Sequence, residues 1–269
     1  MKEHLQEMYF SQAALAAYQT CALKFRYRYL DELSWLQTGH AGGHAEERAL
    51  GESFHLMAQR YFQNVAPDYL DAITPSAQLK VWLNSLREKF PLRDELCYYP
   101  EQELRAVIET ARFTAKYDLL VQYPDGRIII YDWKTQASPG PGRTRPLQAR
   151  VYALVLYMAE PFGKRRPEDI TTVFWNPRFP GDEQVWSYSR LLYEQDRAEL
   201  TALVGKITGL QYGDFSGLRP AEDGSAKGCR WCEYAALCNA GGQVANAGPL
   251  PSPGDVSWDD VEEIAYEEA

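Results

Sequence analysis

Two β-rich segments joined by three residues constrain the fold of this chain most strongly. RFTAKYDLLVQY and RIIIYDWKT flank the sequence Pro124-Asp125-Gly126. Proline, aspartate and glycine in this order suit a type I turn followed by a left-handed residue, the three-residue connection of an antiparallel hairpin. Tyr123 then pairs with Arg127, and this pair sets the register of both strands.

The predicted register brings two acidic residues together. It places Asp118 directly opposite Asp132, with Cβ atoms about 4.5 to 5.5 Å apart. Lys134 lies two residues beyond Asp132, so its side chain joins the same face. Facing carboxylates repel each other, and a divalent cation with a preference for oxygen ligands, Mg²⁺ or Mn²⁺, would relieve the repulsion. The residues alone leave a second interpretation open, in which two solvated acids form an ion pair with the lysine.

The rest of the chain alternates between helical and strand-like patterns. Ser11 is a candidate N-cap for a helix through SQAALAAYQTCALKFRYRYL, whose apolar residues recur at spacings of three and four. Other expected elements are listed by residue number: helices over about 46–62, 76–89, 147–160 and 192–210, and strands over 103–109, 171–175 and 184–188. This order predicts the α/β class with a mixed sheet.

The spacing of the acids resembles a known nuclease signature. Asp118, thirteen intervening residues and then Asp132-Trp133-Lys134 are similar to the motif of the PD-(D/E)XK nuclease superfamily. The resemblance implies a restriction-endonuclease-like mixed central sheet flanked by helices. It also implies that Asp118 and Asp132 bind the metal and that Lys134 lies beside the attacking water, so that all three are catalytic residues.

Two further motifs resemble the RecB-like and CRISPR-associated iron-sulfur exonuclease branch of that superfamily. Gly51-x-x-x-His55 precedes the hairpin, and Gln148-x-x-x-Tyr152 lies on the helix that follows it. The resemblance implies that His55 completes the metal site. It also implies that Gln148 and Tyr152 line the site and contact nucleic acid. Without the resemblance, His55 would be interpreted as a hydrogen-bonded histidine beside the core. Gln148 and Tyr152 would then only be two residues on one face of a helix.

The cysteines give an independent signal. Cys229, Cys232 and Cys238 crowd near the end of the chain, and Cys21 lies far from them in sequence. Thiolates at this spacing can bind a [4Fe-4S] cluster or a structural Zn²⁺ ion. The nuclease resemblance favours the cluster, and it implies an iron-sulfur cluster lobe that joins the N- and C-terminal segments. Cys97 is left over as a partly buried free thiol.

The charge distribution decides where nucleic acid could bind. The net charge is −9, but residues 239–269 hold seven acids and no Lys or Arg, so these acids account for all but −2 of it. Phosphate contacts need local positive charge, and the candidate nucleic-acid-binding residues are Arg26, Arg28, Arg143 and Arg145. The interleaved aromatic residues at 25, 27 and 29 could stack on unpaired bases, or they could pack in the core. The packing interpretation is the better supported of the two.

Four regions are expected: an N-terminal helical segment with the first cluster cysteine (1–45), the nuclease core (46–215), a cysteine-rich segment (216–240) and an acidic flexible tail (241–269). The tail could dock on a protein partner or remain solvated. The chain has neither an apolar run long enough to span a membrane nor an apolar signal sequence at its start, so a cytoplasmic protein without a membrane partner is expected.

Together these features predict a metal-dependent DNA nuclease. It would hydrolyse phosphodiesters with a metal-activated water, as an exonuclease on single-stranded DNA or frayed ends. The resemblance implies a role in DNA repair and recombination or in CRISPR-type DNA processing. The alternative is a catalytically silent DNA-binding or adaptor subunit that retains the nuclease fold.

Overall fold

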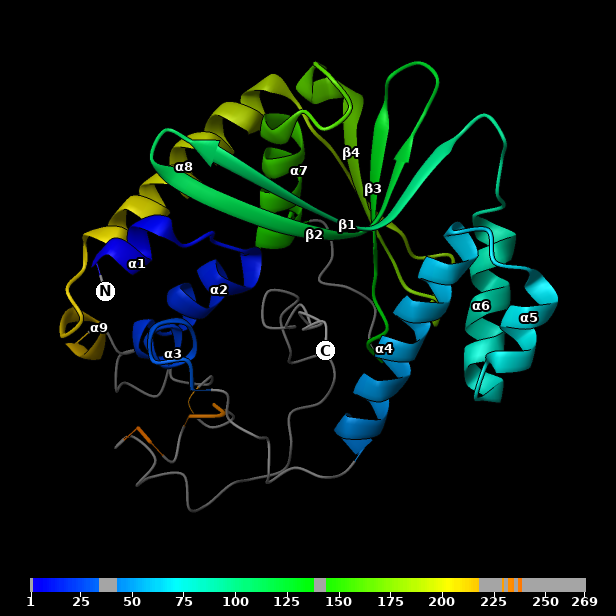
Figure 1. The fold of residues 1–269 in the computed structure, drawn as a ribbon, viewed down its shortest axis with the longest axis horizontal. Helices are drawn as coiled ribbons and strands as arrows, with labels where there is room; N and C mark the ends of the chain where they lie inside the picture. Colours follow the sequence, from blue (N-terminus) through cyan, green and yellow to red (C-terminus); the bar gives the residue numbers. More distant parts are fainter. Residues whose placement is uncertain are drawn as a thin grey trace.

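A computed structural model describes residues 2–33, 43–137, 144–217, 229, 232–234 and 237–238. Arg143 and the acidic tail lie outside these residues. The described strands form a five-stranded sheet in the order β1-β2-β3-β4-β5 (Figure 1). Their bounds are β1 Cys97–Ile108, β2 Ala111–Gln122, β3 Ile128–Trp133, β4 Ile170–Trp175 and β5 Gln184–Ser187. Because β3 and β4 are parallel and the other neighbours antiparallel, the predicted α/β class with a mixed sheet is confirmed.

Helices precede, interrupt and follow the sheet. Their bounds are α1 Lys2–Glu7, α2 Gln12–Thr20, α3 Ala22–Phe25, the π-helix η1 Arg26–Leu30, α4 Gly43–Phe62, α5 Pro67–Ile73, α6 Ala77–Lys89, α7 Leu147–Ala159, the 3₁₀ turn η2 Pro167–Asp169, α8 Arg190–Gly209 and α9 Asp214–Gly217. The predicted cap of α2 is confirmed, because the Ser11 hydroxyl accepts the backbone N–H of Ala14 at 3.2 Å. Ser76 caps α6 in the same way through Leu79.

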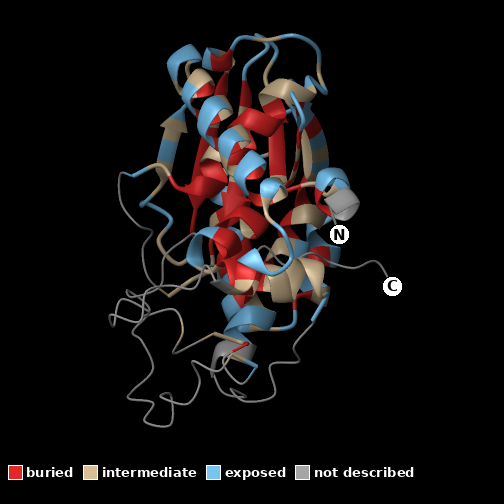
Figure 2. Ribbon diagram, turned by 90° about the vertical axis from the view of Figure 1, so that its left-hand side faces the viewer, coloured by how far each residue is buried: buried red, intermediate tan, exposed pale blue. Residues whose placement is uncertain are grey.

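The sheet is covered by helices from different parts of the chain. One apolar cluster joins α1, α2, α7 and α8 to the sheet, and a second joins α4, α5 and α6 to it. Buried residues gather along the strands and the helix surfaces that face them, while the outer helix surfaces are exposed (Figure 2). Among the described helices, none combines the length and the apolar character needed to span a bilayer.

The predicted hairpin is confirmed. The Tyr123 N–H donates to the Arg127 carbonyl at 2.9 Å, and Gly126 has φ 91°, in the left-handed region that glycine adopts readily. Pairing then runs from Gln122 with Ile128 to Leu119 with Tyr131. The short turn therefore fixes the register as the sequence predicted.

The first predicted helix is not continuous, and this is a correction. Cys21 has extended backbone (φ −163°, ψ 118°), so α2 ends there and α3 begins at the next residue. The helical spacing of apolar residues continues on both sides of the break, and periodicity therefore could not reveal it. The interruption turns Cys21 out of the helical path and makes it partly exposed.

The aromatic residues that follow Cys21 belong to the interior. Phe25 is fully buried and stacks on Phe215 with ring centroids 5.8 Å apart, so the packing interpretation is confirmed for this ring. Tyr27 lies 5.5 Å from the ring of Tyr234, which also donates a hydrogen bond to the Leu33 carbonyl. The N-terminal segment thus contacts residues beside the late cysteines. Cys97 is exposed rather than partly buried, because it begins the edge strand β1.

Candidate metal and catalytic site

Side chains from both helical layers meet where the central strands separate. His55 comes from α4, Asp118 from β2 and Asp132 from β3, while Lys134 directly follows β3. Gln148 and Tyr152 lie one turn apart on α7 and share a face. All six were predicted as site residues, and the fold brings them together in two adjoining groups.

The hydrogen-bond ladder between β2 and β3 ends at this point. Leu119 and Tyr131 form the last β2–β3 pair, one residue before Asp118 and Asp132, so the predicted pairing of the two aspartates stays a prediction. The next backbone donor, Trp133 N–H, bonds instead to Asp118 Oδ2 at 2.6 Å. The strands therefore part where Asp118 and Asp132 lie, and a carboxylate replaces the main-chain acceptor.

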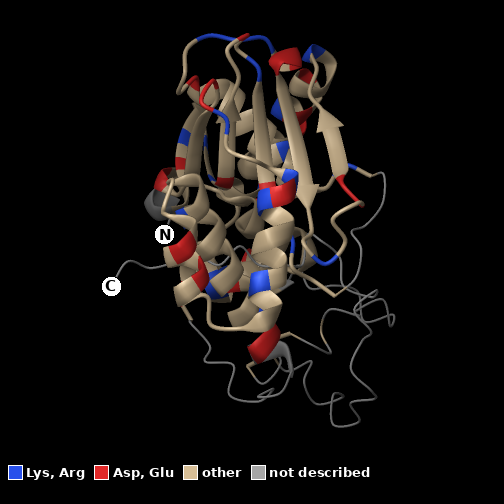
Figure 3. Ribbon diagram, turned by 90° about the vertical axis from the view of Figure 1, so that its right-hand side faces the viewer, with Lys and Arg blue, Asp and Glu red and all other residues tan. Residues whose placement is uncertain are grey.

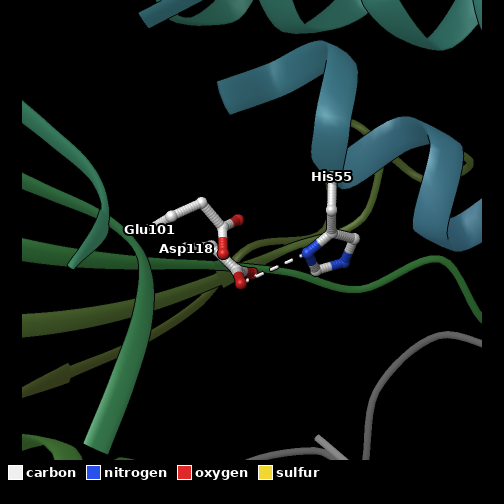
Figure 4. Close-up of side chains that lie close together, drawn as sticks. All are labelled: His55, Glu101 and Asp118. Carbon is white, nitrogen blue, oxygen red and sulfur yellow. Dashed lines mark hydrogen bonds and ion pairs between the residues drawn. The ribbon is translucent and has the colours of Figure 1, made fainter. Parts of the chain in front are cut away.

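The first group contains a residue that the sequence did not predict. His55 Nδ1 lies 3.2 Å from Asp118 Oδ1, and the Glu101 carboxylate from β1 joins them (Figure 4). One ligand atom from each of these residues lies within 4.8 Å of the others. Glu101 also pairs with Lys116, at 3.0 Å. Among the described residues, no other group of three His, Cys, Asp or Glu side chains meets this distance.

The second group is buried around Asp132. Lys134 Nζ lies 2.6 Å from Asp132 Oδ2 and donates to Gln148 Oε1 at 2.6 Å. Gln148 Nε2 in turn donates to Asp132 Oδ1 at 2.8 Å and lies 2.9 Å from the Tyr152 hydroxyl. The ammonium group also lies 4.5 Å from the Phe174 ring centre. Gln148 and Tyr152 therefore orient the carboxylate and the lysine that define the nuclease-like motif.

A glycine sets the approach of α4 to this region. A Cβ atom at Gly51 would lie 2.7 Å from Thr135 Oγ1, which is closer than real Cβ contacts. Because Gly51 and His55 are one helical turn apart, the close approach at Gly51 places His55 beside β2. This explains in physical terms the glycine of the Gly-x-x-x-His motif.

The charges perturb the acid–base properties of both groups. Burial lowers the pKa of His55, but the neighbouring carboxylates, Asp118 above all, outweigh this effect and raise it to about 9. Burial also raises the pKa of Asp132, and despite the opposing effect of Lys134 it reaches about 6. The pKa of Asp118 is lowered, because His55 and the Trp133 N–H outweigh the effect of burial.

These residues fit a divalent metal. The first group supplies one imidazole nitrogen and two carboxylates, a donor set that suits Mg²⁺ or Mn²⁺. Beside it, the buried Asp132 Oδ2 lies 2.6 Å from Lys134 Nζ. Of the expected ligands His55, Asp118 and Asp132, the structure places the first two in one donor group, with Glu101 as the third member.

Three of the arginines predicted to bind nucleic acid lie among the described residues, and each has a protein partner. Arg145 makes two hydrogen bonds of 2.7 Å to the buried Asp196. Arg26 bonds to Asp31 and Ser216, and Arg28 lies 5.8 Å from the Tyr29 ring centre. Basic and acidic residues are interspersed on the side of the molecule drawn in Figure 3. Nucleic-acid contacts by these arginines, and by Arg143 outside the described residues, stay predictions.

The four cysteines are all partly exposed, and none of them forms a disulfide. Burial raises the pKa of Cys232 to about 11. An ion pair of 3.3 Å joins Lys24, close to Cys21, to Glu233, next to Cys232. The structure therefore brings together the two segments that carry the cysteines.

A family of known proteins matches most of the chain. The model of the PD-(D/E)XK nuclease superfamily matches residues 9–239. No curated protein matches the chain. Among solved structures, the chain is similar to SSO0001, with 16% identity, a TM-score of 0.41 and 87% of each chain covered. It is also similar to a proposed exonuclease from Eubacterium rectale, with 11% identity, a TM-score of 0.46 and coverage of 77% of this chain and 83% of the other.

Proposed function

Because the chain belongs to the PD-(D/E)XK nuclease superfamily, we propose that it is a metal-dependent deoxyribonuclease. One observation carries the proposal: a His55, Glu101 and Asp118 donor group lies beside a buried Asp132–Lys134 pair. The donor group suits a hard divalent cation, and the pair supplies a carboxylate and an ammonium group held in fixed positions.

The residues divide the work of phosphodiester hydrolysis. His55 and Asp118 would hold Mg²⁺ or Mn²⁺ together with Asp132, and the bound ion would lower the pKa of a water and neutralise developing negative charge. Lys134 is fixed by Asp132 and Gln148. Its positive charge can orient a water or a phosphate oxygen. Tyr152 holds Gln148 in place, so the aligned amine needs little reorganisation during the reaction.

We further propose that the enzyme acts as an exonuclease on single-stranded DNA or frayed ends, in repair and recombination or in CRISPR-type processing. The resemblance to the RecB-like branch supports this part of the proposal. In this view Arg26, Arg28, Arg143 and Arg145 contribute positive charge near the path of the strand.

A [4Fe-4S] cluster is proposed for Cys21, Cys229, Cys232 and Cys238. Thiolates at this spacing can bind either a cluster or a structural Zn²⁺ ion. The resemblance to iron-sulfur nucleases supports the cluster. Iron and sulfide analysis of anaerobically purified protein, with Cys232→Ser as control, tests this assignment.

The activity is tested with DNA labelled at either end, with and without Mn²⁺. The wild-type chain should shorten single-stranded DNA from one end only in the presence of the metal. Asp132→Asn and Lys134→Met should abolish cleavage, whereas Glu103→Gln should not, because Glu103 is exposed and pairs with Arg105. Undiminished cleavage by the first two variants would reject the proposed function.

A further inference from the structure

Glu101 has an unusual position in the sheet. The β1–β2 pairs Pro100 with Leu119 and Gln102 with Tyr117 enclose it, so it lies opposite Asp118. Its φ is 53°, in the left-handed region that glutamate rarely adopts. The register is the same on both sides of this residue, so the distortion inserts no extra residue and instead redirects one side chain.

The packing along β2 shows the same redirection. Phe113 and Tyr117 belong to the cluster beneath α7, whereas Leu119 belongs to the cluster beneath α4. Strict alternation would place all three on one face. The change of face therefore occurs at Asp118, opposite Glu101, and it allows both carboxylates to meet His55 from α4 (Figure 4).

This meeting carries an electrostatic cost in the chain alone. Carboxylates directly opposite each other repel and destabilise a strand pair. Lys116 offsets this repulsion, because its ammonium group lies 3.0 Å from Glu101, and the His55 ring lies 3.2 Å from Asp118. Lys116 projects from the same strand as Asp118, and its side chain is partly exposed, so its ammonium group can move into solvent.

We propose that Glu101, which lies in one donor group with His55 and Asp118, is an additional protein ligand of the divalent metal, and that Lys116 balances its charge in the metal-free chain. The inference rests on the proposed function, since it takes the metal of that nuclease site as given. It extends the nuclease motif, whose own residues lie on β2 and after it, to a carboxylate on β1.

The test measures Mn²⁺ binding by isothermal titration calorimetry and by the electron paramagnetic resonance of free Mn²⁺, without DNA. Glu101→Gln should raise the Kd at least about tenfold, because the site loses a charged ligand. Glu103→Gln is the matched control, since Glu103 lies two residues away on the same strand and should leave the Kd within about twofold. Lys116→Met should lower the Kd, because it removes the competing cation.

A second variant guards against loss of the fold. Asparagine tolerates the left-handed region better than most residues, so Glu101→Asn should keep the wild-type unfolding midpoint in EDTA and still bind Mn²⁺ weakly. If Glu101→Gln binds Mn²⁺ with wild-type affinity while Asp118→Asn binds it weakly, the metal site exists but Glu101 is not one of its ligands. Equal losses in Glu101→Gln and Glu103→Gln would overturn it too, as an effect of net charge. A wild-type chain that binds no Mn²⁺ would instead reject the proposed function.

Discussion

The buried carboxylate of Asp196 holds the segment that leads into α7. Asp196 is fully buried and accepts three hydrogen bonds from guanidinium groups, two from Arg145 at 2.7 Å and one from Arg150 at 2.8 Å. Arg145 lies just before α7, which carries Gln148 and Tyr152. The network therefore links α8 to the helix that orients Asp132 and Lys134.

Asp196→Asn keeps the shape of the side chain and removes its charge. Each of the three hydrogen bonds between charged groups is worth about 1.5 to 3 kcal/mol, and breaking a buried ion pair costs about 3 to 5 kcal/mol. The side chains of Arg145 and Arg150 are 16% and 24% exposed, so water recovers part of the loss. We therefore expect a loss of about 3 kcal/mol in the free energy of unfolding and a Tm lower by about 6 to 12 °C.

Urea unfolding followed by circular dichroism measures this loss, with Glu199→Gln as control. Glu199 pairs with Arg150 in the same network, but its side chain is 64% exposed, so its removal should cost less than about 1 kcal/mol. If Asp196→Asn costs no more than Glu199→Gln, burial does not strengthen this network and the reasoning is refuted.

Three further predictions test the site and the hairpin. Gly51→Ala should weaken Mn²⁺ binding and lower the free energy of unfolding in urea by about 1 to 2 kcal/mol. In a Thr135→Ala background the same change should be neutral or stabilising by up to about 1 kcal/mol, because alanine favours a helix more than glycine does. Equal effects in both backgrounds would exclude the close contact between residue 51 and Thr135. Since the pKa of His55 in the metal-free chain is raised to about 9, chiefly by Asp118 against the lowering effect of burial, His55 is protonated at pH 7 and must lose its proton to bind metal. Mn²⁺ affinity should thus rise about tenfold per pH unit up to pH 9, and calorimetry in buffers of different ionisation enthalpy should detect about one proton released per ion; no release at pH 7 would contradict the raised pKa. Gly126→Ala should lower the free energy of unfolding by about 1 to 2 kcal/mol, because Gly126 has a φ of 91°. A steric clash does not contribute, since a Cβ atom there would meet no neighbour within 4 Å. An unchanged urea midpoint would argue against the left-handed turn.

The parts of the fold that local chemistry determines could be predicted from the sequence. The Pro124-Asp125-Gly126 turn permits few backbone conformations, so it fixed the register from Gln122–Ile128 to Leu119–Tyr131. Lys134 followed from the two-residue period of a strand and lies beside Asp132 as expected. The extended residue Cys21 could not be predicted, because apolar spacing persists across a single interruption.

The partners of charged side chains were beyond the reach of sequence reasoning for a related reason. Arg145 was a candidate for phosphate contact because it lies in a basic loop, yet its carboxylate partner is Asp196 on a distant helix. A basic side chain favours a nearby negative charge, but the sequence does not show where that charge comes from. Where the fold buries the basic side chain beside a carboxylate of the same protein, that carboxylate is its partner. Gln148 and Tyr152 could be placed on one helix face, but only the fold directs that face at Asp132.

Glu101 shows where the alternation of a strand ceases to predict its faces. The sequence places a strand over 103–109, and extending that alternation backwards assigns Glu101 to the face of Glu103. Glu103 pairs with the exposed Arg105, so the pattern alone makes Glu101 another surface acid. A single left-handed residue breaks this correspondence without changing the register. Backbone distortions of this kind cost free energy and persist where surrounding contacts compensate for them. At Glu101 the distortion brings a third donor atom to His55 and Asp118, so the residue that least resembles a regular strand belongs to the candidate donor group.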